Sequence, residues 1–281
     1  MSSGLFSKKN YPWLIFVVAF VTLLGAAGFR STPGILIDPL HDEFGWGRGT
    51  VGTAVSINVL LFGFIGPFAA ALQGKYGLRR VTVIALLVIS AGALLTTQMT
   101  STWQLYLLWG GVVGTGSGCM ATVFASTVAS RWFVQRRGLV MGALTAATAS
   151  GQLVFLPGLS KLAQDPGWRA SSLVIALGAY LMVPLIFFFL KEDPQSIGTT
   201  PYGADKDWVP PVLQKGNAAK VAINVLKDAS KVKNFWYLVG SFFVCGLSTS
   251  GLIGTHFIPA AHDHGMPTVT AASLLALIGV F

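Results

Sequence analysis

Long apolar stretches, separated by short polar turns, follow one another along the chain from Trp13 onward. An α-helix rises 1.5 Å per residue, so about 20 apolar residues cross the hydrocarbon core of a bilayer. Seven stretches have about this length, at residues 13–37, 50–73, 81–99, 103–128, 138–163, 168–191 and 235–259. An eighth begins near Thr268 and is still apolar at Phe281, so we expect a chain truncated at its C-terminal end. The pattern predicts an all-α fold, a polytopic bundle of membrane helices.

One long polar segment interrupts this pattern. It predicts three parts: an N-terminal six-helix transmembrane bundle (1–191), a cytoplasmic linker (192–234), and the start of a C-terminal transmembrane bundle (235–281). Inside the linker, Ala222, Val225 and Leu226 fall on one helical face and lysines on the other, which predicts an amphipathic helix. Such a helix would lie on an anionic membrane surface or serve as a solvated linker, and the pattern fits both.

The first six spans contain a weak internal repeat at an offset of 90 residues. The stretch PFAAALQGKYGLRRV, which begins at Pro67, aligns with PGLSKLAQDPGWRAS, which begins at Pro157. The offset covers three spans, an odd number, so the two copies must cross the membrane in opposite senses. The sequence therefore predicts two inverted three-helix repeats, a plan that recurs in secondary transporters.

Two of the spans carry small residues at every fourth position. They are Gly110, Gly114 and Gly118 in the fourth span, and Gly138, Gly142, Ala146 and Ser150 in the fifth. Because small side chains let helix backbones approach closely, both stripes are predicted to be packing faces and not ligand sites.

Composition and charge agree with a membrane protein. The 281 residues are 53% hydrophobic and 10% charged, with a mean hydropathy of +0.67, whereas globular domains are about a quarter charged. The formal charge of +9 comes from short clusters between the spans, so we expect no nucleic-acid partner. The clusters fall in alternate loops: Lys8 and Lys9; Lys75, Arg79 and Arg80; Arg131, Arg136 and Arg137; and the lysines of 191–233. The positive-inside rule then predicts a multi-pass protein of the plasma (inner) membrane with a cytoplasmic N-terminus.

Residues that could carry enzymatic chemistry are sparse. Cys119 and Cys245 both lie in apolar runs, which argues against a disulfide framework or a metal site. The spans lack a cluster of Asp, His or Glu at membrane depth, and no serine or threonine has a histidine and an acid nearby. The sequence predicts neither a cofactor, a metal nor a membrane-embedded enzyme.

The first span combines a permanent charge with a helix breaker. Arg30 lies within the apolar run, and Pro33 and Gly34 follow it. A charge at the bilayer centre costs about 2.5–3.5 kcal/mol on insertion scales, so it normally faces a partner or a cavity. The depth of Arg30 also allows its side chain to reach the headgroups at the outer surface. Because a guanidinium binds a carboxylate through two parallel hydrogen bonds, we favour Arg30 as an anion contact beside a hinge at Pro33 and Gly34.

Three other polar residues are weaker candidates for the substrate pathway. Asn58 in the second span and Gln152 in the fifth would line the same cavity, although hydrogen bonding between helices explains them as well. His256, near the outer end of the seventh span, is a candidate titrating group or pore contact, with an interfacial histidine as the alternative.

The loop ALQGKYGLRRV resembles the cytoplasmic loop motif of the major facilitator superfamily, G-x-x-x-D-[RK]-x-G-[RK]-[RK]. The residues that match it are Lys75, Gly77, Arg79 and Arg80. The acidic position is Gly74 in this chain, so the contact that this acid makes between the two halves in the family is in doubt here. The resemblance implies a major-facilitator fold over the whole chain.

Three further stretches are similar to the monocarboxylate and oxalate–formate transporter branch of that superfamily. They are EFGWGRGTVGTAVSIN (43–58), SRWFVQRRGLVMG (130–142) and, as in bacterial members, THFIPAAHDHG (255–265). The arginine that proton antiporters of the superfamily carry in the fourth span is replaced by Trp109.

These features predict a secondary active transporter that works by alternating access. Its partners would be the lipid bilayer, a small solute such as a monocarboxylate or dicarboxylate anion, and a coupling ion, either a proton or a counter-anion. Two alternatives remain open: a receptor or scaffold with the same fold that does not transport, and a transporter for a neutral or drug-like solute.

Overall fold

The computed structural model describes residues 10–31, 33–120, 122–205 and 217–277. This part of the chain consists of helices and short connections, without a β-strand. It confirms the predicted all-α fold and contains six helical stretches that are long and apolar enough to cross a membrane.

The observed helices follow the predicted spans closely. The first six crossings are α1 (Tyr11–Ser31) with α2 (Pro33–Phe44), α3 (Arg48–Tyr76), α4 (Leu78–Thr96), α5 to α7 (Thr102–Leu105, Gly114–Met120 and Thr122–Trp132, with η1 at Tyr106–Val113), α8 (Arg137–Leu162) and α9 (Trp168–Phe189). The remaining elements are η2 (Ala163–Gly167), η3 (Pro194–Ile197), α10 (Ala218–Ala229), α11 (Lys233–Cys245), η4 (Gly246–Ile253), α12 (Gly254–Asp263) and α13 (Thr268–Leu277).

The apolar stretch 137–189 contains two crossings, because the chain reverses between α8 and α9. Asp165 leaves helical geometry (φ −148°, ψ 113°), and Gly167 has a positive φ of 128°. Beyond the reversal, Ser171 Oγ donates a hydrogen bond of 2.9 Å to the Leu159 carbonyl, twelve residues earlier in the chain. The fifth and sixth spans therefore form a helical hairpin.

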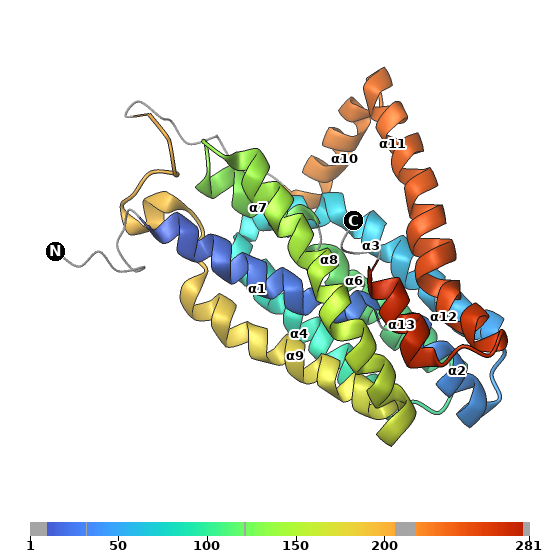
Figure 1. The fold of residues 1–281 in the computed structure, drawn as a ribbon. Helices are drawn as coiled ribbons and strands as arrows, with labels where there is room; N and C mark the ends of the chain where they lie inside the picture. The colour runs from blue at the N-terminus through green and yellow to red at the C-terminus, as the bar shows by residue number, and fades with distance from the viewer. Residues whose placement is uncertain (1–9, 32, 121, 206–216, 278–281) are drawn as a thin grey trace.

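The helix contacts have the symmetry that two inverted repeats require. The first crossing packs along the fifth, α1 on α8, and the second packs along the fourth, α3 on α6 and η1. Exchanging spans one, two and three with spans four, five and six, respectively, converts the contact between spans one and five into the contact between spans four and two. Figure 1 shows α1 beside α8 and α4 beside α9 within a single bundle.

One of the two predicted small-residue faces packs as expected. A Cβ at Gly110, Gly114 or Gly118 would come within 3.0–3.1 Å of α3, near Ile57, Asn58 and Ile65 respectively. These glycines therefore allow the fourth crossing to lie directly on the second.

The predicted packing role of the fifth-span stripe is wrong for the described residues. A Cβ at Gly138 or Gly142 would meet nothing within 4 Å, and Ala146 is exposed. The close contact lies one position off the stripe, at Gly151, where a Cβ would overlap the Leu24 carbonyl oxygen and the Ala27 side chain. The i+4 spacing identifies a face of small residues on α8. Which residue of α8 contacts α1 depends on how α1 crosses it.

The amphipathic helix α10 packs against α3, an arrangement that neither sequence-based interpretation included. Ala218 and Ala222 are its buried residues, whereas Val225 is 54% exposed. The capping residue is Asn217, whose side chain accepts a hydrogen bond from the Ala219 amide at 3.1 Å.

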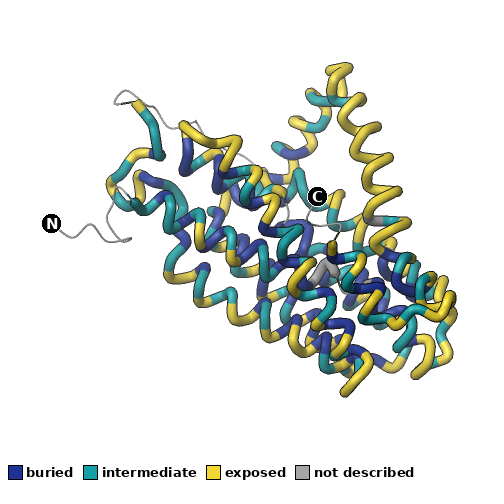
Figure 2. The backbone as a smooth tube through the Cα atoms, viewed as in Figure 1, coloured by how far each residue is buried: buried dark blue, intermediate teal, exposed yellow. Residues whose placement is uncertain are grey.

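The seventh crossing contacts the six-helix bundle through α12. Its first helix, α11, has no buried residue and is exposed along its length in Figure 2. In α12, by contrast, Thr255, Ile258 and Pro259 are buried, and this helix lies against α2. The seventh span is thus held at one end of the bundle, while α13 packs on α8.

Candidate functional site

A small cavity of about 110 Å³ lies inside the six-helix bundle. The residues that line it come from the first, second, fourth and fifth crossings: Leu23, Ala26, Phe62, Ser117, Met120, Thr122, Ala125, Leu144, Thr145 and Thr148. Its wall is mostly apolar with four hydroxyl groups. This combination is typical of small-molecule sites, in which a few polar groups orient the ligand.

Arg30 and Gln152 each lie one helical turn beyond a residue that lines this cavity. On α1, Arg30 is four residues beyond Ala26, and on α8, Gln152 is four residues beyond Thr148. The crossing at Gly151 brings the two helices together at this level. Gln152 is half-buried, and the side chain of Arg30 lies outside the described part of the structure.

The helix break falls at the residues predicted as a hinge. α1 ends at Ser31 and α2 begins at Pro33, whose side chain is also outside the described part. Gly34 is buried. A Cβ there would lie 3.1 Å from the carbonyl oxygen of Gly254, the first residue of α12. The glycine therefore allows the backbones of the first and seventh spans to approach closely.

Asn58 and His256 lie away from the cavity wall. Asn58 Nδ2 donates a hydrogen bond of 2.8 Å to the Trp109 carbonyl, which lies in the π-helical segment η1. Through this hydrogen bond Asn58 joins the second and fourth crossings. His256 is exposed on α12.

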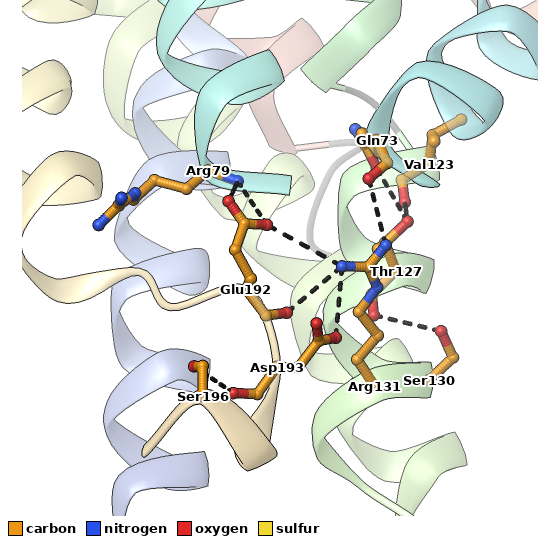
Figure 3. A network of polar contacts seen from close by, with 9 residues as sticks. All are labelled: Gln73, Arg79, Val123, Thr127, Ser130, Arg131, Glu192, Asp193 and Ser196. Atoms are coloured by element: carbon orange, nitrogen blue, oxygen red, sulfur yellow. Dashed lines mark hydrogen bonds and ion pairs between the residues drawn. The ribbon is translucent and has the colours of Figure 1, made fainter. Parts of the chain in front are cut away.

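The predicted basic loop forms one end of the bundle, which we call the basic end: Lys75 to Arg80, Arg131 to Arg137, and residues 191–193. Figure 3 shows its polar network, which centres on Glu192. The backbone amide of Arg79 donates hydrogen bonds of 3.2 and 3.3 Å to the two Glu192 carboxylate oxygens. A carboxylate at this position, the first turn of α4, interacts favourably with the helix dipole.

Gly77 provides the space for this carboxylate. It has a φ of +96°, and a Cβ there would lie 2.5 Å from Glu192 Oε1. The positive φ favours glycine at this position, and the missing Cβ leaves room for the carboxylate.

Arg131 links the same network to α3 and α7. Its side chain is 14% exposed and donates hydrogen bonds to the Gln73 carbonyl (3.2 Å), the Glu192 carbonyl (3.3 Å) and Asp193 Oδ1 (3.4 Å). Gln73 is itself fully buried and binds the Cys119 carbonyl and the Thr127 hydroxyl. The turn between α3 and α4 and the end of α9 are thus held on α7.

The four motif residues have different surroundings at this end. Gly77 and the Arg79 amide contact Glu192, and the Arg79 guanidinium lies 5.4 Å from the centre of the Phe187 ring. The Lys75 ammonium lies 5.1 Å from the centre of the Tyr76 ring, and Arg80 is exposed. Although Gly74 leaves the acidic motif position empty, a carboxylate from the end of the sixth span, Glu192, contacts the loop.

No role was predicted from the sequence for Glu192, Asp193 or Gln73. The signal available was the pair of acids directly after the sixth apolar run, at the side where the other charges are basic.

Acidic residues gather at the opposite end of the bundle. The Arg48 guanidinium binds Asp263 Oδ2 and Oδ1 at 2.5 and 2.8 Å, and it lies 3.2 Å from Asp38 Oδ1. Arg48 begins α3, Asp38 is in α2 and Asp263 ends α12. This charged contact therefore joins the first and second spans to the seventh.

A second ion pair at this end lies entirely within the six-helix bundle. Glu43 accepts hydrogen bonds from Trp168 Nε1 (2.6 Å) and Arg169 (2.7 Å). Burial alone would raise the pKa of the Glu43 carboxyl, but these hydrogen bonds and the charge of Arg169 hold that pKa below its usual value. The stabilisation is complete above the ordinary pKa of glutamate and is lost as the pH falls through the lowered one.

We predict that Gly77→Ala will lower stability by about 2 kcal/mol, because alanine is strained at this φ and displaces the Glu192 carboxylate. Thermal unfolding of the protein in detergent measures this change. Gly74→Ala, three residues earlier, is the control because a Cβ there meets nothing within 4 Å. Equal melting temperatures for the two variants would contradict the assigned role of Gly77.

The described residues contain no group of three or more His, Cys, Asp or Glu side chains that could hold a metal ion.

The chain is similar in sequence to membrane transporters. It is 24% identical to the MFS-type transporter YcxA of Bacillus subtilis, over 98% of this chain and 63% of that protein. It is 27% identical to monocarboxylate transporter 4 of Gallus gallus, over 96% of this chain and 54% of that protein. The chain thus spans less than two thirds of the length of these relatives, which are named as transporters and not as enzymes.

Solved structures show the same fold. A bacterial homologue of the human lysosomal transporter Spinster, in an inward-facing and unoccupied conformation, matches with a TM-score of 0.71 and 15% identity, over 96% of this chain and 60% of that one. A D-xylose-proton symporter matches with a TM-score of 0.61 and 16% identity, over 96% and 66%. The sequence profile of the Major Facilitator Superfamily matches residues 10–281. The chain therefore belongs to the Major Facilitator Superfamily.

Proposed function

We propose that this protein is a secondary active transporter for a small organic anion, a monocarboxylate or dicarboxylate, and that it works by alternating access. Family membership and the transporters among its relatives support transport of a small solute. The anionic class rests on one observation: Arg30 lies on α1, one helical turn beyond Ala26 of the cavity wall.

A cavity followed by an arginine one turn further along α1 fits an anion better than a neutral solute. The cavity itself offers hydroxyl groups and apolar side chains, which bind the uncharged parts of a small molecule. Arg30, one turn beyond this wall in the sequence of α1, would supply a planar pair of donors that matches a carboxylate. Gln152, at the same level on α8, would add a neutral hydrogen-bonding group.

The proposed function includes an orientation of the protein in the membrane and a coupling of anion movement to a second ion. The basic end would face the cytoplasm, as the positive-inside rule requires, and the protein would lie in the plasma membrane. Movement of an anion would be coupled to a proton or to a counter-anion. His256, which is exposed on the seventh span, is the candidate pore contact there.

Uptake of labelled carboxylates into proteoliposomes tests this function. Arg30→Ala should raise KM by about 10- to 100-fold, the loss expected when a hydrogen bond between charged groups is removed. Arg30→Lys should retain part of the affinity, since it keeps the charge but not the fork of donors.

Lys161→Ala is the control for Arg30, because it removes another cation of the same bundle at an exposed position. Unchanged KM in both Arg30 variants would rule out Arg30 as the anion contact. Uptake of a neutral analogue in preference to the carboxylates would rule out the anionic class.

A further inference from the structure

A second cavity, an open cleft of about 500 Å³, lies at the end of the bundle that carries the acidic residues. Most of its wall comes from α2 and from the reversal between α8 and α9, and α12 and α13 add one residue each. The residues that line it are Ile35, Asp38, Pro39, Asp42, Glu43, Ser160, Ala163, Gln164, Gly167, Trp168, His262 and Thr268. The cleft shares no lining residue with the smaller cavity, and its volume is typical of small-molecule sites.

Carboxylates dominate the charge of this cleft. Asp38, Asp42 and Glu43 line it, and no described lysine or arginine does. Glu43 is paired with Arg169 and Asp38 with Arg48, both of which lie outside the lining. Asp42 is exposed and makes no ion pair with another described residue. The cleft therefore offers an uncompensated negative charge, which favours a cationic ligand.

A buried hydroxyl without a partner adds a second group that points to a ligand. Ser160, near the end of α8, is fully buried and lines the cleft, and its Oγ has no hydrogen-bond partner in the described structure. On α2, Asp38 Oδ1 is also buried and accepts no hydrogen bond, although the Arg48 guanidinium lies 3.2 Å away. Because buried polar groups are normally paired, a ligand with hydrogen-bond donors would satisfy atoms that the protein leaves open.

The rest of the wall is suited to hydrocarbon. Ile35, Ala163 and Trp168 are buried residues of the lining, and Pro39 is half-buried. The polar atom of Trp168, Nε1, already donates to Glu43, so its ring contributes apolar surface. The cleft thus combines acceptors and a negative charge with an apolar face.

We propose that this cleft, which we call the ammonium cleft, binds a small organic ammonium ion with an apolar part. An ammonium group carries three donors and no acceptor, which matches the carboxylate oxygens of α2 and the Ser160 hydroxyl. A metal ion fits less well, since the described residues contain no group of three or more side chains that could hold one. The inference does not depend on alternating access or on the proposed carboxylate substrate.

Isothermal titration calorimetry of the protein in detergent tests this site, with benzylammonium chloride as the probe. Benzylammonium should bind saturably. Benzyl alcohol has the same ring without the charge, and it should bind about 10-fold more weakly, since hydrogen bonds to charged groups are the stronger ones. The comparison separates recognition of the ammonium from partition of an aromatic ring into detergent.

Two substitutions locate the binding within the cleft. Ser160→Ala should raise the Kd for benzylammonium by about fivefold, the loss expected for one hydrogen bond. The same change should not lower the melting temperature of the free protein, because the hydroxyl has no partner to lose. Asp42→Asn should also raise the Kd, by up to about fivefold, because an exposed carboxylate contributes modestly to an ion pair.

Ser172→Ala is the matched control. Ser172 of α9 is also fully buried with an unpaired hydroxyl, but it does not line the cleft, so its loss should leave the Kd unchanged. The proposal is overturned if benzylammonium does not bind saturably, if benzyl alcohol binds equally well, or if Ser160→Ala and Ser172→Ala weaken binding equally.

The ammonium cleft and the proposed transport of an anion can fail separately. Calorimetry requires no transport, so binding of benzylammonium by a protein without carboxylate uptake would support the cleft and count against the proposed substrate class. Carboxylate uptake by a protein that does not bind benzylammonium would support the proposed function and overturn the cleft.

Discussion

Gly151→Leu should prevent α1 from packing on α8 and lower the stability of the protein by about 3 kcal/mol or more. At this position a Cβ alone would overlap the Leu24 carbonyl oxygen and the Ala27 side chain. The obstacle is backbone, which cannot rotate aside as a flexible side chain can. The two helices would have to separate, and with them the wall of the cavity between Ala26 and Thr148.

Thermal unfolding in detergent measures this effect, and the expected fall in melting temperature is on the order of 10 °C. Gly151→Ala should already lose part of the stability, since the overlap begins at the Cβ. Gly158→Leu is the matched control because it lies two turns further along the same helix with nothing within 4 Å. If the melting temperatures of Gly151→Leu and Gly158→Leu are equal, the close crossing of α1 and α8 does not determine the stability of the fold.

The crossings themselves could be predicted because each depends on local composition. An apolar run of about 20 residues must become a helix in a membrane, since no other structure satisfies its backbone groups. The hinge at Pro33 is predicted for a similar local reason, because proline removes a backbone donor and constrains the residue before it, and it stays a prediction. Observed helix ends differ from the predicted ends by a few residues, as at Arg48 and Tyr76 of α3.

Contacts between distant segments could not be predicted, because they depend on how the helices pass one another. The stripe from Gly138 to Ser150 has the spacing of a packing face, yet the described helices leave it open and use Gly151. Likewise, Arg48 and Asp263 are unremarkable as separate residues at the ends of two spans. Their pairing follows only from the approach of α12 to α2.

At the basic end, too, a contact depends on a partner that lies far away in the sequence. The motif predicted a contact for the loop around Gly77, and the vacant acidic position at Gly74 placed that contact in doubt. The carboxylate that contacts this loop is that of Glu192, which accepts a hydrogen bond from the Arg79 amide 113 residues away, and both residues belong to the six-helix bundle. A pattern within one loop cannot reveal a partner supplied by another helix.

Arg131→Met should lower the stability by about 3 kcal/mol, the second large effect that we expect. Methionine has a similar length and keeps the apolar contacts, so the change removes chiefly the charge and the donors. The Gln73 and Glu192 carbonyls and the Asp193 carboxylate would each lose a hydrogen bond. Glu192 would also lose the cation that lies 4.0 Å from its carboxylate.

Thermal unfolding of Arg131→Met against Arg137→Met measures this effect, because Arg137 is a nearby basic residue with an exposed side chain. Arg131→Lys should be intermediate, since an ammonium keeps the charge but cannot reach three acceptors in the geometry of a guanidinium. The double variant Arg131→Met/Glu192→Gln should lose less stability than the sum of the losses in the two single variants. In the double variant, Glu192→Gln removes a carboxylate that has already lost its cationic partner. Additive losses would show that Arg131 and Glu192 act independently, and the basic end would then be held by the Arg79 amide and Gly77 alone.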